Sequence, residues 1–317
     1  MKKIKKREIG ISFSRKKTTF APNCIAMVLN FITWNVDPVL FSIGSLQVRW
    51  YGLFWALGFL IGYFIMQKIY RREKMTDDSL DKLLIYMLVS TIIGARLGHC
   101  LFYEPGYYLS HPLEILKIWE GGLASHGGAI GILIGLFIYA RKVKKPYIWI
   151  LDRIVIAVCL VGALIRCGNV MNHEIYGTPT SLPWGFVFMR GQEQFCGTFD
   201  NYSLCTSWGD CCPPSEWLPC HPTGLYEAFF CLVALGILLW MYYKRDLGNR
   251  QPGVMFSVFL IIIFGSRIAI ESLKNVQVDF ENDMLFDMGQ WLSVPFVIAG
   301  IVIWIWSARK RKIAERQ

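Results

Sequence analysis

The chain has 317 residues, of which 54% are hydrophobic and 15% aromatic, and its mean hydropathy is +0.39. This composition is too apolar and too aromatic for an ordinary soluble domain, and it indicates a membrane protein. The formal net charge of +10 is typical of proteins that bind nucleic acid, but the placement of the basic residues along the chain argues against that partner.

The amino-terminal segment is basic and contains no long apolar run. Residues 1–26 carry eight Lys and Arg residues together with Pro22 and several polar side chains. We therefore expect residues 1–35 to form a disordered extension without a signal peptide or an anchor. Our preferred explanation is that translation begins at Met27, because the net charge of the remaining chain then falls from +10 to +3. The alternative is a genuine tail without a function.

Seven apolar runs follow, each near the ~20 residues that a membrane-spanning helix needs. They cover residues 51–66, 83–103, 123–140, 148–165, 225–243, 253–270 and 288–307. A soluble protein with buried helices would not separate so many apolar runs by charged segments. The pattern predicts an all-α polytopic membrane protein with about seven transmembrane helices in one domain, residues 36–308, and a small irregular outer (periplasmic) head.

Basic segments follow the first, third and fifth runs, and a basic tail at residues 309–317 follows the seventh. The other connections contain few Lys or Arg residues. Because basic loops stay in the cytoplasm, we expect the amino terminus of the transmembrane domain outside and the carboxy terminus in the cytoplasm. The basic residues at 1–26 contradict this orientation unless translation begins at Met27. The remaining excess of positive charge follows from the topology, so we expect no nucleic-acid partner.

One outer loop, residues 170–222, is rich in cysteine. It contains Cys196, Cys205, Cys211, Cys212 and Cys220. An oxidising exterior favours disulfides, but an odd number leaves at least one thiol and the pairing cannot be deduced. Zinc binding is the alternative, with His221 beside Cys220, although no regular spacing of ligands is present.

The polar residues of the apolar runs gather near the ends that we place outside. They are Tyr51, Arg96, His126, Arg166, Asn169, Arg267 and Glu271, together with His221, Tyr226 and Glu227 at the outer start of the fifth helix. An intramembrane cation is costly unless an anion meets it, and the most abundant anion at this depth is a lipid phosphate. The convergence on one layer therefore predicts a site for a phospholipid headgroup near the outer leaflet. A transporter for anions or lipids is the alternative, but it would spread its polar groups through both leaflets or show internal repeats.

Several motifs occur in a defined order over residues 36–308. They include Gly94-Ala-Arg-Leu-Gly98, Ser125-His-Gly-Gly128, Arg166-Cys-Gly-Asn-Val-Met-Asn-His-Glu-Ile-Tyr-Gly177, Leu225-Tyr-Glu227 and Arg267…Glu271. In this order they resemble the phosphatidylglycerol–prolipoprotein diacylglyceryl transferase family. The family pattern Gly-Arg-x-Gly-Asn-Phe-x-Asn-x-Glu-x-x-Gly is the most specific of them. This chain departs from it at Ile165 and Val170, and we expect these apolar replacements to adjust packing and not chemistry.

The resemblance implies a reaction. The diacylglyceryl group of phosphatidylglycerol moves to the thiol of the lipobox cysteine in a prolipoprotein, a thioether forms, and glycerol phosphate leaves. The implied partners are phosphatidylglycerol, the prolipoprotein signal peptide with its lipobox, and membrane lipid, and no cofactor or metal is needed. The implied location is the bacterial cytoplasmic (inner) membrane, with the active site near the outer leaflet.

The resemblance also implies a role for each candidate residue. A free thiol has a pKa of ~8.5, so a base must help to remove its proton. Histidine titrates nearest to neutral pH, which makes His126 the candidate base. Arg166 and Arg267 each offer a planar fork of donors to the phosphate. Tyr51 is expected to bind the phosphate or the peptide, and Glu271 to orient Arg267.

The remaining candidates bind the lipid in this hypothesis. They are Asn169, Asn172, Glu174, Gly177, Arg96 and Gly127. Structural alternatives stay open for several residues. His126 is a structural hydrogen-bond donor in one of them, and Glu271 only neutralises Arg267 in another. Arg96 anchors a loop carbonyl in a third, and Gly127 serves helix packing in a fourth.

Overall fold

The computed structural model describes residues 31–44, 46–118, 122, 124–205, 213–274 and 286–314. Long helices dominate these ranges. They are α1 (Trp50–Arg72), α2 (Asp77–Phe102), α4 (Ser125–Lys142), α5 (Tyr147–Met171), α6 (Thr223–Tyr243), α8 (Val254–Glu271) and α9 (Met288–Ala314). Residues 1–30, which make up most of the expected amino-terminal extension, lie outside the described part of the chain.

The all-α polytopic membrane fold is confirmed. Within the described ranges, six helices are long and apolar enough to cross a membrane, namely α1, α2, α5, α6, α8 and α9. Helix α4 lies where the third apolar run predicts a helix, but it is not among the six. It is 18 residues long and includes Arg141 and Lys142 in its last turn. Whether α4 is the seventh crossing stays a prediction.

Several helices extend beyond the apolar runs into the basic segments. Helix α1 has Arg71 and Arg72 in its last turn, and α4 ends in Arg141 and Lys142. Lys and Arg have good helix propensity and are favourable near a carboxy-terminal helix end, where the macrodipole is negative. The apolar runs therefore predict the membrane-facing part of each helix but not its last turns.

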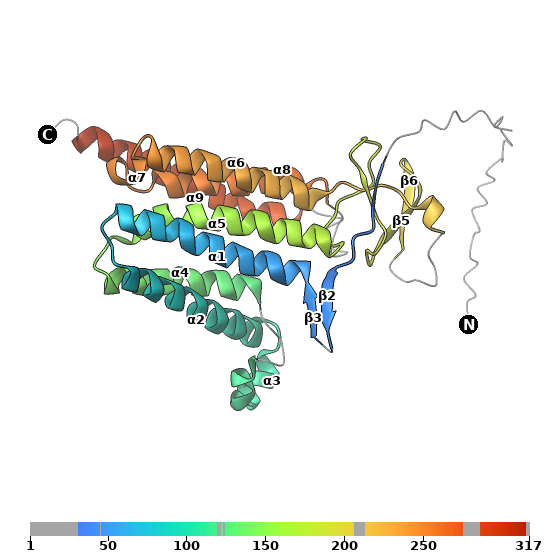
Figure 1. Ribbon diagram of the computed structural model, residues 1–317, viewed down its shortest axis with the longest axis horizontal. Coiled ribbons are helices and arrows are strands. Elements are labelled where there is room, and N and C mark those ends of the chain that lie inside the picture. Colours follow the sequence, from blue (N-terminus) through green and yellow to red (C-terminus); the bar gives the residue numbers. More distant parts are fainter. Residues whose placement is uncertain are drawn as a thin grey trace, which may run out of the picture. The chain divides into compact units, whose positions relative to one another are not determined.

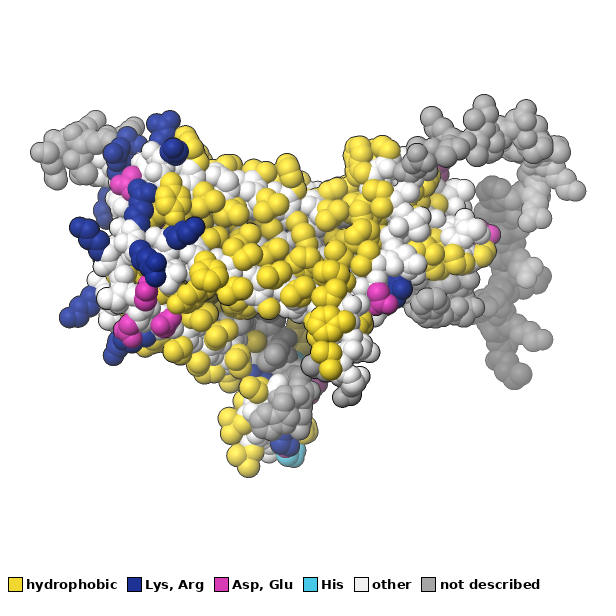
Figure 2. Space-filling view, in the orientation of Figure 1, with side chains coloured by type: hydrophobic (Ala, Val, Ile, Leu, Met, Phe, Trp, Pro, Cys, Tyr) yellow, Lys and Arg dark blue, Asp and Glu magenta, His cyan; other side chains and the backbone are white. Residues whose placement is uncertain are grey.

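The helices pack mainly in pairs, α1 with α5, α2 with α4, α5 with α6, and α8 with α9 (Figure 1). The core lies among these pairs and includes Ile69, Tyr70, Tyr139, Ile156 and Leu238, which are fully buried. In the view of Figure 2, apolar side chains cover the sides of the helices, whereas dark-blue Lys and Arg side chains gather at the end near α7 (Leu247–Arg250). We call this end the basic end and the opposite one the head end.

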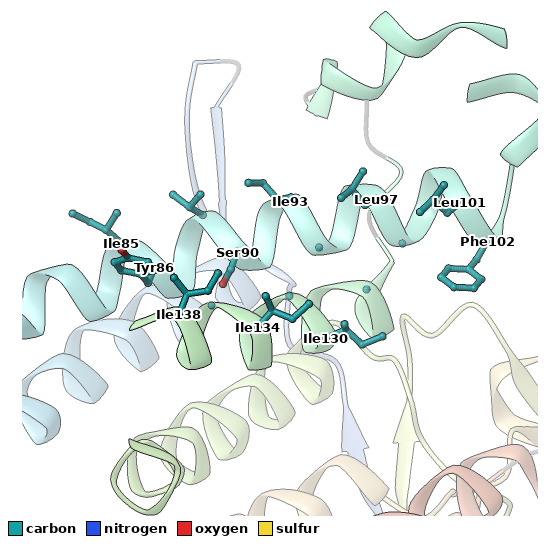
Figure 3. Close-up of a pocket in the computed structure, with 16 residues that line it drawn as sticks. Ile85, Tyr86, Ser90, Ile93, Leu97, Leu101, Phe102, Ile130, Ile134 and Ile138 are labelled. Atoms are coloured by element: carbon teal, nitrogen blue, oxygen red, sulfur yellow. The ribbon is translucent and has the colours of Figure 1, made fainter. Parts of the chain in front are cut away.

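Helices α2 and α4 approach each other through glycines. A Cβ atom on Gly131 would lie 2.2 Å from the carbonyl oxygen of Ser90, and one on Gly94 would lie 2.4 Å from that of Gly127. Only a residue without a side chain permits such an approach. The contact leaves an apolar groove of about 530 Å³ between rows of side chains such as Ile93 on α2 and Ile134 on α4 (Figure 3). Glycines four residues apart on both helices therefore permit this close packing.

Buried charges tie the helices together at the basic end. The fully buried Arg153 on α5 forms an ion pair with Glu73, with 2.8 Å between Nη2 and Oε1. Its neighbour Asp152 accepts hydrogen bonds from the backbone N–H groups of Gly253 (2.6 Å) and Phe256 (2.8 Å). A carboxylate at this position satisfies N–H groups that have no partner within the first turn of α8.

The head contains short strands that the sequence does not predict. Strand β1 (Ile32–Trp34) pairs in parallel with β4 (Phe186–Phe188). Two antiparallel pairs join β2 (Val39–Ile43) to β3 (Leu46–Arg49) and β5 (Gln194–Thr198) to β6 (Asn201–Cys205). Short helical segments complete the described chain, namely α3 (Pro105–Ser110), η1 (Pro112–Leu116) and η3 (Pro214–Glu216). The head is therefore partly ordered by β-pairing.

The head has a small core of its own and contains cysteines in two states. Its buried residues are Val170, Phe186, Phe188, Phe195 and Cys220. Cys196 is disulfide-bonded, which confirms the prediction of disulfide chemistry in this loop. Cys220 is a buried thiol, and burial raises the pKa of that thiol to about 12. Cys211 and Cys212 lie outside the described residues. Nowhere in the described part are three or more His, Cys, Asp or Glu side chains placed to hold a metal ion.

Candidate active site

Charged side chains from three helices meet at the head end of the bundle. Arg166 lies on α5, Glu227 on α6, Arg267 and Glu271 on α8, and Lys274 follows α8 directly. Arg166 Nε lies 2.7 Å from Glu227 Oε2, and Lys274 Nζ lies 2.9 Å from Glu227 Oε1. Lys274 Nζ also lies 3.1 Å from Glu271 Oε2, which is 3.8 Å from Arg267 Nε. These five residues alternate in charge, and we call them the charge chain.

Neither arginine of the charge chain uses all of its N–H donors on its carboxylate. The short contact between Arg166 and Glu227 is an ion pair without hydrogen-bond alignment, because Glu227 Oε2 accepts no hydrogen bond from the described residues. The side chain of Arg166 is 25% exposed. Arg267 is 40% exposed, and its nearest carboxylate oxygen is beyond hydrogen-bonding distance. Both guanidinium groups therefore retain donors for another anion.

Two carboxamides lie beside Arg166. Arg166 Nη1 donates a long hydrogen bond of 3.4 Å to Asn169 Oδ1. Asn169 Nδ2 donates to Glu174 Oε1 at 2.7 Å, and Asn172 Nδ2 donates to the same oxygen at 3.4 Å. Glu174 thus orients both carboxamides. The arrangement leaves Asn172 Oδ1 without a hydrogen-bond partner among the described residues.

The segment after Glu174 is held in an unusual backbone conformation. Ile175 has φ +58°, which is rare for a β-branched residue. Thr223 Oγ1 donates to the Ile175 carbonyl at 2.7 Å, and the Gly177 N–H donates to the His221 carbonyl at 2.8 Å. The start of α6 therefore fixes the segment. Such strain persists only where the surrounding contacts determine the conformation.

Gly177 lies where this segment crosses the end of α8. It forms an antiparallel bridge with Lys274, and a Cβ atom there would lie 2.2 Å from the Leu273 carbonyl oxygen. Any side chain at position 177 would push the segments around Gly177 and Lys274 apart. The structure therefore gives Gly177 a packing role, and direct binding of phosphatidylglycerol by this residue stays a prediction.

Tyr51 lies at the start of α1 against the turn of α5 that carries Arg166. A Cβ atom on Gly168 would lie 2.9 Å from Tyr51 Cδ2, so the glycine makes room for the ring. On the side of this turn that leads to the basic end, an apolar groove of about 330 Å³ runs between α1, α2 and α5 and reaches Gly162 and Ile165. The charged side chains and the apolar groove thus adjoin each other at the head end.

Known proteins resemble the chain over nearly its whole length. Residues 38–306 match the family model described as prolipoprotein diacylglyceryl transferase. The chain belongs to this family. Three relatives are named phosphatidylglycerol–prolipoprotein diacylglyceryl transferase. The one from Porphyromonas gingivalis is 45% identical, covering 86% of this chain and 93% of that protein. The one from Tolumonas auensis is 43% identical, covering 88% of this chain and 98% of that protein. The one from Chloroherpeton thalassium is 40% identical, covering 90% of this chain and 98% of that protein.

Other candidate residues of this family member lie apart from the charge chain. His126 is exposed at the start of α4 and makes no hydrogen bond or ion pair with any other described residue. Gly127 packs on Gly94 and Gly98, as the packing alternative predicts. Arg96 is 4% exposed and donates to the carbonyls of Glu114 and, through Nε at 2.9 Å, Ile115, among other contacts.

Arg96 is therefore a loop anchor. Its guanidinium also donates to the Gly122 carbonyl and lies over the Tyr108 ring, 5.1 Å from the ring centroid. A guanidinium with these backbone partners holds the connection between α2 and α4, the second of the two alternatives for this residue.

Two members of the cluster have no role predicted from the sequence, which places Glu227 in the outer polar layer without a role and does not single out Lys274. A weak signal for Lys274 exists, because it follows Glu271 by three residues, the spacing at which side chains meet on one face of a helix. Glu227 occurs in the motif Leu225-Tyr-Glu227, but its contact with Arg166 joins two helices that are far apart in sequence. Only the packing of α5 on α6 reveals it.

Proposed function

We propose that the chain transfers the diacylglyceryl group of phosphatidylglycerol to the thiol of the lipobox cysteine of a prolipoprotein. A thioether forms and glycerol phosphate leaves. Family membership supports this function. The observation that carries it is the placement of Arg166 and Arg267 in one charge chain at the head end, each with donors left for a phosphate.

In the proposed reaction, the sulfur attacks the glycerol carbon that bears the phosphoester. The C–S bond forms as the C–O bond breaks, and the departing phosphate takes the electron pair. His126 accepts the thiol proton. Arg166 and Arg267 stabilise the charge that develops on the phosphate. A contact of this kind typically lowers the barrier by ~2.7–4 kcal/mol, which corresponds to a rate factor of roughly 10²–10³.

The surrounding groups bind the rest of the lipid in this proposal. Asn169 and Asn172, oriented by Glu174, bind the glycerol headgroup. The apolar groove that ends at Gly162 and Ile165 accommodates acyl chain next to the phosphate site. Tyr51 packs on Gly168, in the helical turn that carries Arg166, and binds the phosphate or the peptide in this proposal. No step needs a residue from the basic end.

We place the protein in the bacterial cytoplasmic membrane, with the basic end in the cytoplasm and the head end at the outer leaflet. The secreted precursor then meets phosphatidylglycerol on the outer side. The substrates are proposed from the reaction that gives the family its name.

The test uses the purified protein in detergent with acyl-labelled phosphatidylglycerol and a lipobox peptide. The wild type should move the label to the peptide cysteine. Arg166→Ala should abolish transfer. Arg267→Lys should lose roughly 10²-fold, because Lys keeps the charge but not the fork of donors. Arg71→Lys is the matched control, since Arg71 is 65% exposed at the basic end, and it should act as the wild type does.

The protein reconstituted into vesicles tests the alternative, because label that crosses the vesicle membrane without reaching the peptide would favour the transporter instead. Retained transfer by Arg166→Ala would contradict the role of the charge chain.

A further inference from the structure

Lys274 occupies the centre of the charge chain. Its side chain is only 7% exposed, and its ammonium bridges Glu227 and Glu271 at 2.9 and 3.1 Å. Its backbone is held as well. The Lys274 N–H donates to the Glu271 carbonyl at 2.9 Å, and the residue forms a bridge with Gly177. The ammonium is therefore fixed between two carboxylates that come from different helices.

The charge balance of the cluster depends on this residue. With Lys274, three cations face two carboxylates, so Arg166 and Arg267 are not both needed to neutralise the glutamates. Without it, Glu227 and Glu271 would each be a buried carboxylate with a single arginine as counterion. An unpaired buried charge is costly, and each carboxylate would draw its arginine into an aligned ion pair.

We infer that Lys274 is a positioning residue, which neutralises Glu227 and Glu271 together and so keeps Arg166 and Arg267 available to the phosphate of the lipid. The inference rests on the proposed function. Lys274 does not touch the lipid, because its ammonium is buried between the carboxylates. Removing this positive charge weakens the binding of an anion, although Lys274 is not itself the anion's partner.

The loose contacts of the two arginines support this role. Glu227 Oε2 accepts no hydrogen bond from the described residues although Arg166 Nε is 2.7 Å away, whereas Glu227 Oε1 accepts one from Lys274. Glu271 Oε2 likewise accepts a hydrogen bond from Lys274 and lies 3.8 Å from Arg267. In both pairs the lysine makes the aligned contact and the arginine does not.

The experiment measures binding of phosphatidylglycerol separately from turnover. Full-length protein in mixed micelles is titrated with phosphatidylglycerol that carries brominated acyl chains, and the quenching of tryptophan fluorescence gives an apparent Kd. Transfer to a lipobox peptide gives kcat and KM in parallel. A wild type that binds the lipid without transfer would count against the proposed function, and the Kd values would still test Lys274.

Lys274→Met should weaken binding at least tenfold, and Lys274→Arg, which keeps the charge, should weaken it by less than threefold. Lys82→Met is the matched control. Lys82 pairs with Asp78 at the basic end and is 49% exposed, so its variant should bind as the wild type does. Near-normal binding by a folded Lys274→Met protein would overturn the inference.

Second substitutions separate positioning from a merely structural role. The double variant Lys274→Met/Glu227→Gln lacks the carboxylate that would capture Arg166. Its apparent Kd for phosphatidylglycerol should therefore be at least tenfold lower than that of Lys274→Met alone. No recovery would mean that Lys274 binds the lipid directly or only maintains the fold. Glu227→Gln alone should bind phosphatidylglycerol several-fold more tightly, because it releases Arg166. This variant decides the question even where Lys274→Met does not fold, and weaker binding would overturn the inference.

Discussion

Three arginines of the bundle show how the pairing of a charged side chain reflects its role. Arg153 is completely buried, and its terminal nitrogens donate to Glu73, to Asn249 and to the Gly248 carbonyl. Arg166 and Arg267 are partly exposed, and neither makes an aligned contact with its carboxylate. A buried guanidinium whose two terminal nitrogens are both hydrogen-bonded to other elements holds helices together, whereas a partly exposed one that keeps terminal donors can bind a ligand.

His126 gives a prediction at the same scale. Its exposed position at the start of α4 leaves both ring nitrogens accessible to a substrate thiol. His126→Gln should lower kcat by roughly 10²–10⁴, the usual contribution of a general base, with little change in KM for phosphatidylglycerol. Transfer kinetics at several pH values provide the measurement. A near-normal rate at every pH would show that another group removes the proton.

The sequence predicted part of this residue-level picture. It assigned Arg166, Asn169, Glu174, Arg267 and Glu271, because polar residues at the ends of apolar runs are expensive and conspicuous. It placed Arg96 in the site only as one of two alternatives. The depth of a residue along a helix follows from counting, but the neighbouring helix that its side chain faces does not. The rotation of each helix about its own axis decides which carboxylate a guanidinium meets.

Among the elements, the contact between α2 and α4 tolerates no side chains. Gly131→Leu should destabilise the protein by about 1–3 kcal/mol through overpacking, because even a Cβ atom would lie 2.2 Å from the Ser90 carbonyl oxygen. The thermal unfolding midpoint in detergent checks this. Gly236→Ala on α6 is the control, since its Cβ atom would meet nothing within 4 Å, and it should be neutral or slightly stabilising. Equal effects of both substitutions would contradict the role of the glycine contact.

The head should loosen in acid because of His173. This residue is 2% exposed, its Nε2 lies 2.8 Å from the Val36 carbonyl, and its Nδ1 accepts from the Arg190 N–H. Burial holds the pKa of His173 below its usual value, so the folded head favours the neutral ring. The resulting stability is present above the ordinary pKa of ~6.5 and is lost as the pH falls through the lowered value.

Hydrogen exchange of β1 and β4, corrected for its intrinsic pH dependence, should therefore quicken between about pH 7 and 5. A His173→Asn variant should lose most of this change, while His111→Asn, on an exposed connection, should keep it. If the exchange of β1 and β4 stays constant in the wild type, His173 does not stabilise the head.

The elements differ in how far the sequence predicts them. The first and last helices begin within one residue of their apolar runs, since a span of ~20 apolar residues has few alternatives in a membrane. The strands escape prediction because they are three to five residues long. One of them, β1, pairs with a segment more than 150 residues away. A strand of three to five residues is too short to show a detectable alternation of apolar and polar residues.

For the whole molecule, the uneven distribution of charge predicts its orientation. Lys and Arg side chains gather at the basic end, so this end should face the cytoplasm (Figure 2). A protease recognition sequence inserted at Asp200, in the turn between β5 and β6, should be cut when the protease is added to intact spheroplasts. The same sequence at Lys144, between α4 and α5, should be cut only after lysis. The reverse pattern would place the head end in the cytoplasm.

Helix α5 serves both ends of the bundle at once. Asp152 and Arg153 fix it to α1 and α8 at one end, and Arg166 belongs to the charge chain roughly 20 Å away at the other. One extra residue between these points would turn Arg166 about 100° around the helix axis, away from Glu227, and leave the apolar length almost unchanged. Such a protein would still insert into a bilayer and yet have lost the contact between Arg166 and Glu227, so the spacing from Arg153 to Arg166 should tolerate substitutions far better than insertions or deletions.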